Sequence, residues 1–135
     1  MTHFATRYIG TPWRRYGRSM AGFDCWGLVI WVLREHYGIV VEDAIADGSK
    51  TSERVRAFIE YEKTQMADWV SVDYPMDGDI VVMGNRNAVP THCGIYIQVD
   101  QNTSGVLHCE EEIGCVFERA SNIRWPSLRF YRHKQ

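Results

Sequence analysis

The chain is 135 residues long, the size of one ordinary domain, and we expect residues 1–135 to fold as a single unit. Hydrophobic residues account for 45% of it and charged residues for 24%, a composition that excludes a disordered tail or a fibrous protein. The net charge is -2 and neither half of the chain is strongly basic, so we expect no nucleic-acid partner bound through its phosphates.

The apolar runs Trp26–Leu33 and Ile80–Met83 are far shorter than a bilayer crossing requires, so we expect no membrane insertion. The first residues, Met-Thr-His-Phe-Ala-Thr-Arg, lack the basic, apolar and small segments of a secretion signal. We therefore expect no signal peptide.

Arginines gather near the N-terminus, where Arg7, Arg14, Arg15 and Arg18 precede the first acidic residue, Asp24. Arginine suits planar recognition of carboxylates. Two interpretations are open: a site for an acidic ligand, or a solvated basic face.

The four cysteines, Cys25, Cys93, Cys109 and Cys115, include no CxxC pair, which disfavours a zinc knuckle or a thioredoxin-type motif. A chain of this size and apolar content does not need disulfides. We expect all four to be thiols.

The strongest helical pattern covers Asp24–Tyr37, whose apolar residues recur at helical spacing and cover most of its surface. Asp24 suits the N-cap, and Gly38 suits the residue that ends a helix. A helix this apolar is expected at the centre of the fold.

The remaining elements follow in chain order. A more polar helix is expected over Ser52–Trp69, and residues 75–79 form a turn, after which the pattern changes to the alternation of strands. The expected strands are Ile80–Met83, Gly94–Val99, Val106–Cys109, Cys115–Arg119 and Leu128–Arg132. One central helix on a mostly antiparallel sheet of five to six strands is an α+β arrangement.

Cys25 is the strongest candidate for chemistry, because it begins the central helix. Exposed amide N–H groups and the positive end of the helix dipole stabilise a thiolate there. A nucleophilic thiol also needs a base, and His92 begins a predicted strand. His108 ends the next strand, where hairpin pairing brings it beside His92 as the group that orients the imidazole.

Two other interpretations stay open. A buried cysteine is more often a small core residue than a nucleophile. The pairs His92-Cys93 and His108-Cys109 have the ligand types of a tetrahedral zinc site. Neighbouring residues of a strand point to opposite faces, which disfavours zinc. We expect no metal site and no cofactor.

A series of motifs in this chain resembles the NlpC-type cell-wall cysteine peptidases, a papain-like family. They run in order from Tyr8 to His108: Tyr8-Ile-Gly-Thr-Pro-Trp13, Gly17, Gly22-Phe-Asp-Cys-Trp-Gly-Leu-Val29, Asp77-Gly-Asp-Ile-Val81, His92-Cys-Gly-Ile-Tyr-Ile97 and Val106-Leu-His108. The block around Cys25 is the most specific of them.

The resemblance implies a papain-like NlpC fold in which Cys25 is the nucleophile, His92 the general base and His108 the orienting residue. It also implies a substrate, the stem peptides of peptidoglycan, commonly cut between D-γ-glutamate and a diamino acid such as meso-diaminopimelate.

Three features resemble the subgroup that tailed phages encode among their tail assembly genes: Trp26, where many cellular members have serine, the Pro12-Trp13 pair, and the closing segment Leu128–His133. This subgroup implies other phage tail-tip proteins as partners. It implies the virion tail, or the host cytoplasm during assembly, as the location.

The chain departs from the family pattern at Trp13, where many members carry a tyrosine that helps to hold the oxyanion. Trp13, Tyr16 or the backbone N–H of Cys25 must then serve. We also expect Asp24 near the site. Arg14, Arg15 and Arg18 are expected near the cleft, where they could pair with the free α-carboxylate of the γ-linked glutamate.

Two rival functions remain. One is a structural tail-tip component whose site is inactive or only binds peptide. The other is an acyltransferase or amidase with a substrate outside the wall, because papain-like circular permutants also act on lipids.

Overall fold

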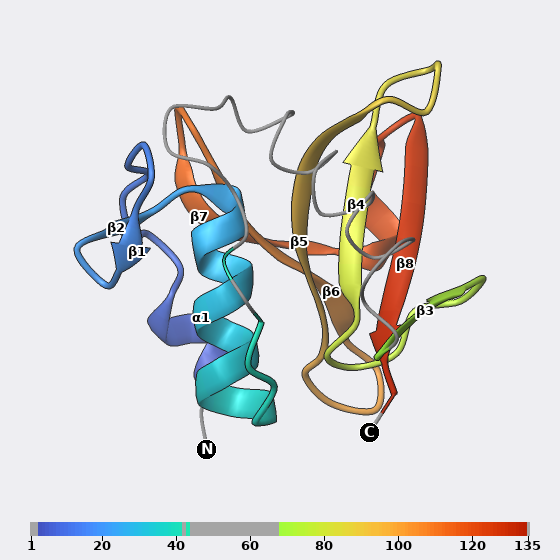
Figure 1. Ribbon diagram of the computed structural model, residues 1–135, viewed down its shortest axis with the longest axis horizontal. Helices are drawn as coiled ribbons and strands as arrows, with labels where there is room; N and C mark the ends of the chain where they lie inside the picture. Colours follow the sequence, from blue (N-terminus) through green and yellow to red (C-terminus); the bar gives the residue numbers. More distant parts are fainter. Residues whose placement is uncertain (1–2, 42, 44–67, 135) are drawn as a thin grey trace.

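The computed structural model describes residues 3–41, 43 and 68–134, in which one α-helix packs against a six-stranded antiparallel sheet (Figure 1). The α+β class is therefore confirmed. In chain order the elements are η1 (Phe4–Arg7), β1 (Arg18–Ser19), β2 (Gly22–Phe23), α1 (Cys25–Tyr37), β3 (Trp69–Val72), β4 (Ile80–Gly84), β5 (Pro90–Gln98), β6 (Ser104–Glu110), β7 (Gly114–Arg119), η2 (Ala120–Asn122) and β8 (Ser127–His133).

Helix α1 has the ends that its sequence predicts. The Asp24 side chain accepts a hydrogen bond from the backbone N–H of Gly27 at 2.7 Å, which satisfies an amide at the helix N-terminus. At the other end Gly38 adopts the left-handed conformation (φ 67°) that ends the helix. Most residues of the helix between these caps are buried, so α1 is the central helix of the core.

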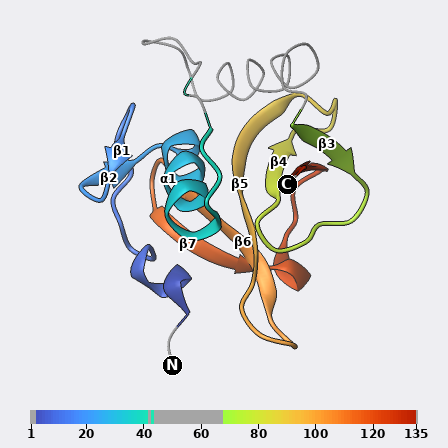
Figure 2. The ribbon, with the colours of Figure 1, turned by 60° about the horizontal axis from the view of Figure 1, so that its bottom comes forward.

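The six strands of the large sheet lie in the order β3-β8-β4-β5-β6-β7. Alternate residues of these strands divide between its two faces. One face shares a core with α1 and carries, among others, Ile80, Val82, Ile95, Leu107 and Tyr131. The other face carries a smaller cluster of Val81, Met83 and Val106. Figures 1 and 2 show α1 alongside β5 and β6, so the helix covers this part of the sheet.

The five predicted strands are all present, each with ends within four residues of those expected. The sequence missed β3 and the β1–β2 ribbon, because segments of four and two residues carry too little alternation to be recognised. The predicted helix Ser52–Trp69 lies outside the described residues except for its last two positions. Trp69 itself begins β3, where it pairs with His133 of β8.

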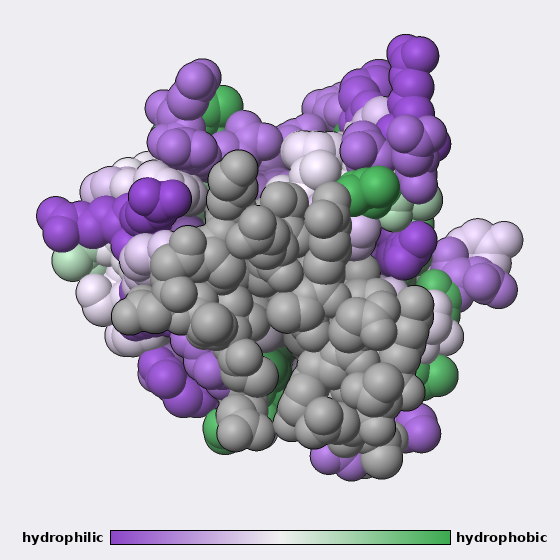
Figure 3. Space-filling model, turned by 45° about the horizontal axis from the view of Figure 1, so that its top comes forward, coloured by the Kyte–Doolittle hydropathy of each residue, from purple (hydrophilic) through white to green (hydrophobic). Residues whose placement is uncertain are grey.

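All four cysteines are buried free thiols, as expected. Within the described part of the chain, no helix is long and apolar enough to span a membrane. The described residues visible in Figure 3 are mostly hydrophilic, with hydrophobic side chains scattered among them.

Candidate active site

Cys25 is the first residue of α1 and is only 1% exposed. The turn of chain around it is tightly built, because a side chain at Gly27 would collide with the carbonyl oxygen of Gly17. Arg18 donates to both that carbonyl and Asp24, and so joins the β1–β2 ribbon to the helix cap. These contacts hold the thiol at a defined position at the positive end of the helix dipole.

Two neighbouring residues of β5, His92 and Cys93, reach the Cys25 thiol. Burial alone would raise the pKa of Cys25, but hydrogen bonding to Cys93 and His92, together with the charge of His92, holds this pKa well below its usual range. The contact with Cys25, with burial, raises the pKa of Cys93 well above its own usual range. Cys93 therefore keeps its proton, and Cys25 is the thiolate of the pair.

His92 and His108 face each other across β5 and β6. His92 Nε2 lies 2.8 Å from His108 Nδ1, and the rings meet edge to face. The two strands are in register at Ile95 and Leu107. Gly94 allows this approach, because a Cβ there would lie 2.9 Å from His108 Cβ and 2.7 Å from the Leu107 carbonyl oxygen. The hairpin thus brings the two predicted histidines together.

A residue that the sequence analysis missed completes this chain of contacts. His108, which is fully buried, has its Nε2 2.8 Å from Oε1 of Glu118 on β7. Glu110 is the second carboxylate nearby, with Oε1 3.8 Å from His108 Nδ1. Burial and the charge of His92 lower the pKa of His108, although Glu118 and Glu110 act in the opposite direction. His108 is therefore neutral at pH 7.

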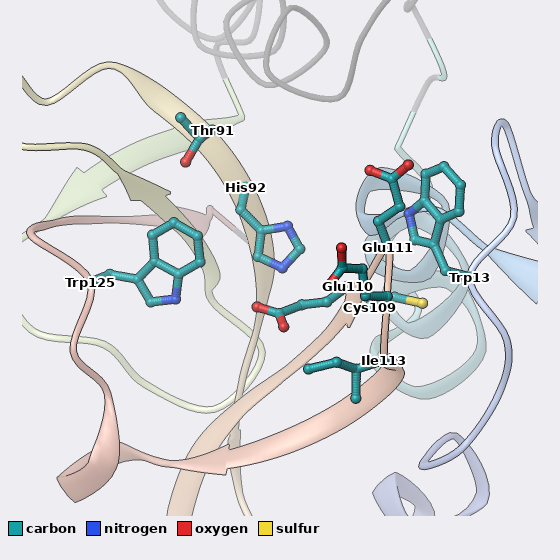
Figure 4. A pocket seen from close by; sticks show the side chains of 9 residues that line it. Trp13, Thr91, His92, Cys109, Glu110, Glu111, Ile113 and Trp125 are labelled. Atoms are coloured by element: carbon teal, nitrogen blue, oxygen red, sulfur yellow. The ribbon is translucent and has the colours of Figure 1, made fainter.

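A cavity of about 370 Å³ opens beside this chain of contacts (Figure 4). Trp125 and His92 lie on one side of it and Trp13 on the other. The acidic run Glu110–Glu112, which follows His108 in the sequence, lines the cavity. Its other lining residues are Thr91, Cys109 and Ile113.

A sequence model of a protein family, described as the NlpC/P60 family, matches residues 10–124. The chain belongs to the NlpC/P60 family. It is therefore a cysteine peptidase, and the matched region contains Cys25, His92, His108 and Glu118.

One similar solved structure is described as the NlpC/p60 domain of peptidoglycan hydrolase SagA. The alignment of the two structures covers 93% of this chain and 90% of the SagA domain chain, with 19% sequence identity and a TM-score of 0.56. A likeness at this identity supports the fold, so the papain-like NlpC arrangement is confirmed. A search of curated proteins finds no match.

Among the other residues expected at this NlpC/P60 site, only Trp13 lines the cavity. Asp24 directly precedes Cys25, is 1% exposed and caps α1. Tyr16 lies in the loop before β1, where its backbone has a positive φ of 59°.

The three arginines expected near the cleft do not line this cavity. Arg18 is held by two carboxylates, 2.7 Å from Asp24 and 2.7 Å from Asp43. The side chain of Arg15 lies over the ring of Tyr16, and Arg14 is exposed. The sequence could not show that Arg18 is paired within the protein, because an arginine that binds an acidic side chain and one that binds an acidic ligand look alike in a sequence.

The four residues of the alternative zinc site, His92, Cys93, His108 and Cys109, do not converge as one set of ligands. Cys93 and Cys109 belong to the core shared with α1, and Cys109 Sγ donates to the carbonyl oxygen of Phe23 at 3.3 Å. Within the described ranges, one group of possible ligands is His92, His108 and Glu110, with ligand atoms within 4.8 Å of one another. The hydrogen bond between the two histidines explains their closeness without an ion.

Proposed function

We propose that this protein hydrolyses the stem peptides of peptidoglycan, with Cys25 as nucleophile, His92 as general acid and base, and His108 as the residue that orients His92. The observation that carries the proposal is the position of Cys25 at the N-terminus of α1, in contact with His92, whose Nε2 lies 2.8 Å from His108 Nδ1. The substrate class is supported by NlpC/P60 membership and by the similar SagA domain, whose description names a peptidoglycan hydrolase.

The reaction is an acyl transfer in two stages. The Cys25 thiolate attacks the carbonyl carbon, and the C–N bond breaks as His92 gives its proton to the leaving amine. Neutral His92 then takes a proton from water, which attacks the thioester and releases the acid and the Cys25 thiolate. No proton is gained or lost by His108 over the cycle.

The tetrahedral intermediate needs hydrogen-bond donors for its oxyanion. The backbone N–H of Cys25, at the helix N-terminus, is one donor in this proposal. The indole N–H of Trp13 is the second, because Trp13 lines the cavity from the side opposite Trp125.

The finer assignments come from the sequence resemblance. The bond cut is the one between D-γ-glutamate and the diamino acid, and the enzyme acts as a component of a phage tail with other tail-tip proteins as partners. Mass spectrometry of fragments from digested wall identifies the bond. Proteomic analysis of purified virions tests the location, and absence of the chain from virions would end the phage-tail assignment.

The decisive experiment compares wild type, Cys25→Ala and Cys115→Ala on purified muropeptides. We expect Cys25→Ala to lower the rate by about 10³-fold or more, because the covalent route is lost. Cys115→Ala is the matched control: it also removes a buried thiol, but one that faces Cys109 across β6 and β7. Equal product from wild type and Cys25→Ala would refute the mechanism.

The rival structural role has one observation in its favour: Cys25 is buried and is not among the residues that line the cavity. A vestigial thiol should be no more reactive than the other three. Alkylation by iodoacetamide near pH 6 separates the cases, since a stabilised thiolate reacts first. Preferential alkylation of Cys25 is expected.

A further inference from the structure

We infer that Glu118 is a positioning residue that sets the direction of the hydrogen bonds running from His108 to His92 and so selects which nitrogen of His92 serves Cys25. The inference rests on the proposed cysteine mechanism. It goes beyond the family triad, because it assigns a role to a carboxylate on a further strand.

The direction follows from the donor and acceptor chemistry of each group. An ionised carboxylate only accepts hydrogen bonds, so the 2.8 Å contact with Glu118 requires a proton on His108 Nε2. A neutral imidazole carries one N–H, which leaves His108 Nδ1 as an acceptor. The 2.8 Å contact between His108 Nδ1 and His92 Nε2 therefore has His92 as its donor.

This direction leaves His92 Nδ1 as the nitrogen that exchanges a proton with Cys25. When His92 is protonated by the thiol, both its nitrogens carry hydrogens, and its Nε2–H already has an acceptor in His108. With the other tautomer of His108, two N–H groups would face each other at this distance, which opposes formation of the imidazolium. The Glu118 carboxylate favours the productive tautomer, and no proton needs to leave His92 toward His108 or Glu118.

Each strand around His108 contributes one ionisable group that faces it: His92 from β5, Glu110 from β6 and Glu118 from β7. Glu110 lies on the Nδ1 side, where it would favour the opposite tautomer. Its oxygen is 3.8 Å away, beyond hydrogen-bonding distance, whereas that of Glu118 is at 2.8 Å. Glu118 therefore decides the tautomer.

The strand register explains why Glu118 can act in this way. His108 pairs with Val116 and Val106 pairs with Glu118, so Glu118 lies two residues beyond the position directly opposite His108 on the same face of the hairpin. A long side chain reaches across such a diagonal. Glu118 is partly exposed, whereas the histidine that it contacts is fully buried.

The first test is the protonation pattern of His108, measured by nitrogen-15 NMR on the wild-type protein. We expect the Nε2–H tautomer, with Nδ1 unprotonated. A spectrum with the proton on Nδ1 would overturn the inference. This measurement needs no substitution and no wall substrate, so it stands even if muropeptides are not cleaved.

The second test compares Glu118→Gln with Glu110→Gln, because each removes one negative charge close to His108. An amide can donate as well as accept, so Glu118→Gln permits the wrong tautomer. We expect the rate of Cys25 alkylation at pH 6 to fall by about tenfold or more, which corresponds to the loss of a hydrogen bond to a charged group. Glu118→Asp, which retains a carboxylate, should recover part of this rate.

Glu110→Gln should leave His108 in the Nε2–H tautomer. If the two Gln variants reduced Cys25 reactivity equally, the effect would be one of charge alone and the inference would be wrong. If Glu118→Gln left the pH dependence of Cys25 alkylation unchanged, the inference would also be wrong. If both tests succeed while muropeptides stay intact, the role of Glu118 stands and the proposed substrate fails.

Discussion

Trp125 stacks on the imidazole of His92, with ring centroids 5.6 Å apart and planes inclined by only 17°. The indole belongs to the segment between η2 and β8, and it forms one wall of the cavity. A parallel aromatic face attracts a cation above it and keeps water from the bond that His92 makes with His108. Trp125 thus covers the imidazole that carries the proton in the proposed mechanism.

Trp125→Ala should therefore lower kcat on muropeptides by about tenfold, within the range of a partly desolvated cation–π contact. Trp125→Phe retains a ring and should keep most of the activity. The comparison is made at matched thermal stability of the two variants. Equal losses in both would show that stacking on His92 is not the cause.

The pH dependence of thiol alkylation should differ among the cysteines. The lowered pKa of Cys25 means that its thiolate is present at neutral pH and is lost only when the pH falls through that lowered value. The raised pKa of Cys93 has the opposite consequence, because its thiolate forms only above the usual range. Site-resolved mass spectrometry between pH 5 and pH 9 should find Cys25 modified first. Modification of Cys93 before Cys25 would contradict this assignment.

Trp13→Phe tests the proposed second donor to the oxyanion. The substitution keeps an aromatic side chain in the cavity wall but removes the indole N–H. We expect kcat to fall by about 10²-fold with little change in KM, as for the loss of one oxyanion donor elsewhere. An unchanged kcat would leave the backbone N–H of Cys25 as the donor that matters.

Asp24→Ala should destabilise the fold by about 1–3 kcal/mol, because the N-cap of α1 and the buried partner of Arg18 are lost together. Asp43→Ala is the matched control. It removes the other carboxylate that binds Arg18. The Asp43 side chain is exposed, so its loss should lower the free energy of unfolding by no more than about 0.5 kcal/mol. Urea unfolding measures both, and similar losses would show that the ion pair matters more than the cap.

Gly94→Ala should separate β5 from β6 beside His108. Its Cβ would lie 2.7 Å from the Leu107 carbonyl oxygen, so the two strands must move apart. Gly84→Ala provides comparable crowding, with its Cβ 2.8 Å from the Val89 carbonyl oxygen at the β4–β5 end. Both should lose stability, but only Gly94→Ala should change the NMR signals of His92 and His108 and reduce Cys25 alkylation. Unaltered histidine signals in Gly94→Ala would contradict the role of this glycine.

Much of the candidate site could be predicted because its signals are local. The cap at Asp24, the apolar pattern that follows and Gly38 define α1, and they place Cys25 at its N-terminus. Strand alternation located β5 and β6, and the hairpin between them was enough to expect His92 beside His108.

The missed features depend on contacts between distant segments. Arg18 looked available for a ligand until the fold placed Asp24 and Asp43 against it. Trp125 showed no pattern in the sequence that connected it with His92, 33 positions earlier. Nothing local in the sequence places the acidic run Glu110–Glu112 at a cavity, which the fold forms beside it.

Capping residues and periodicity act over short stretches of chain, so the sequence by itself determined the helix, its leading cysteine, the positions of most strands and the two histidines. Only the tertiary structure decided that Glu118 bonds His108, that Trp125 covers His92 and that Arg18 supports the helix cap. Those contacts depend on the register between β6 and β7 and on where the loops close, and both are set by packing of the whole sheet against α1.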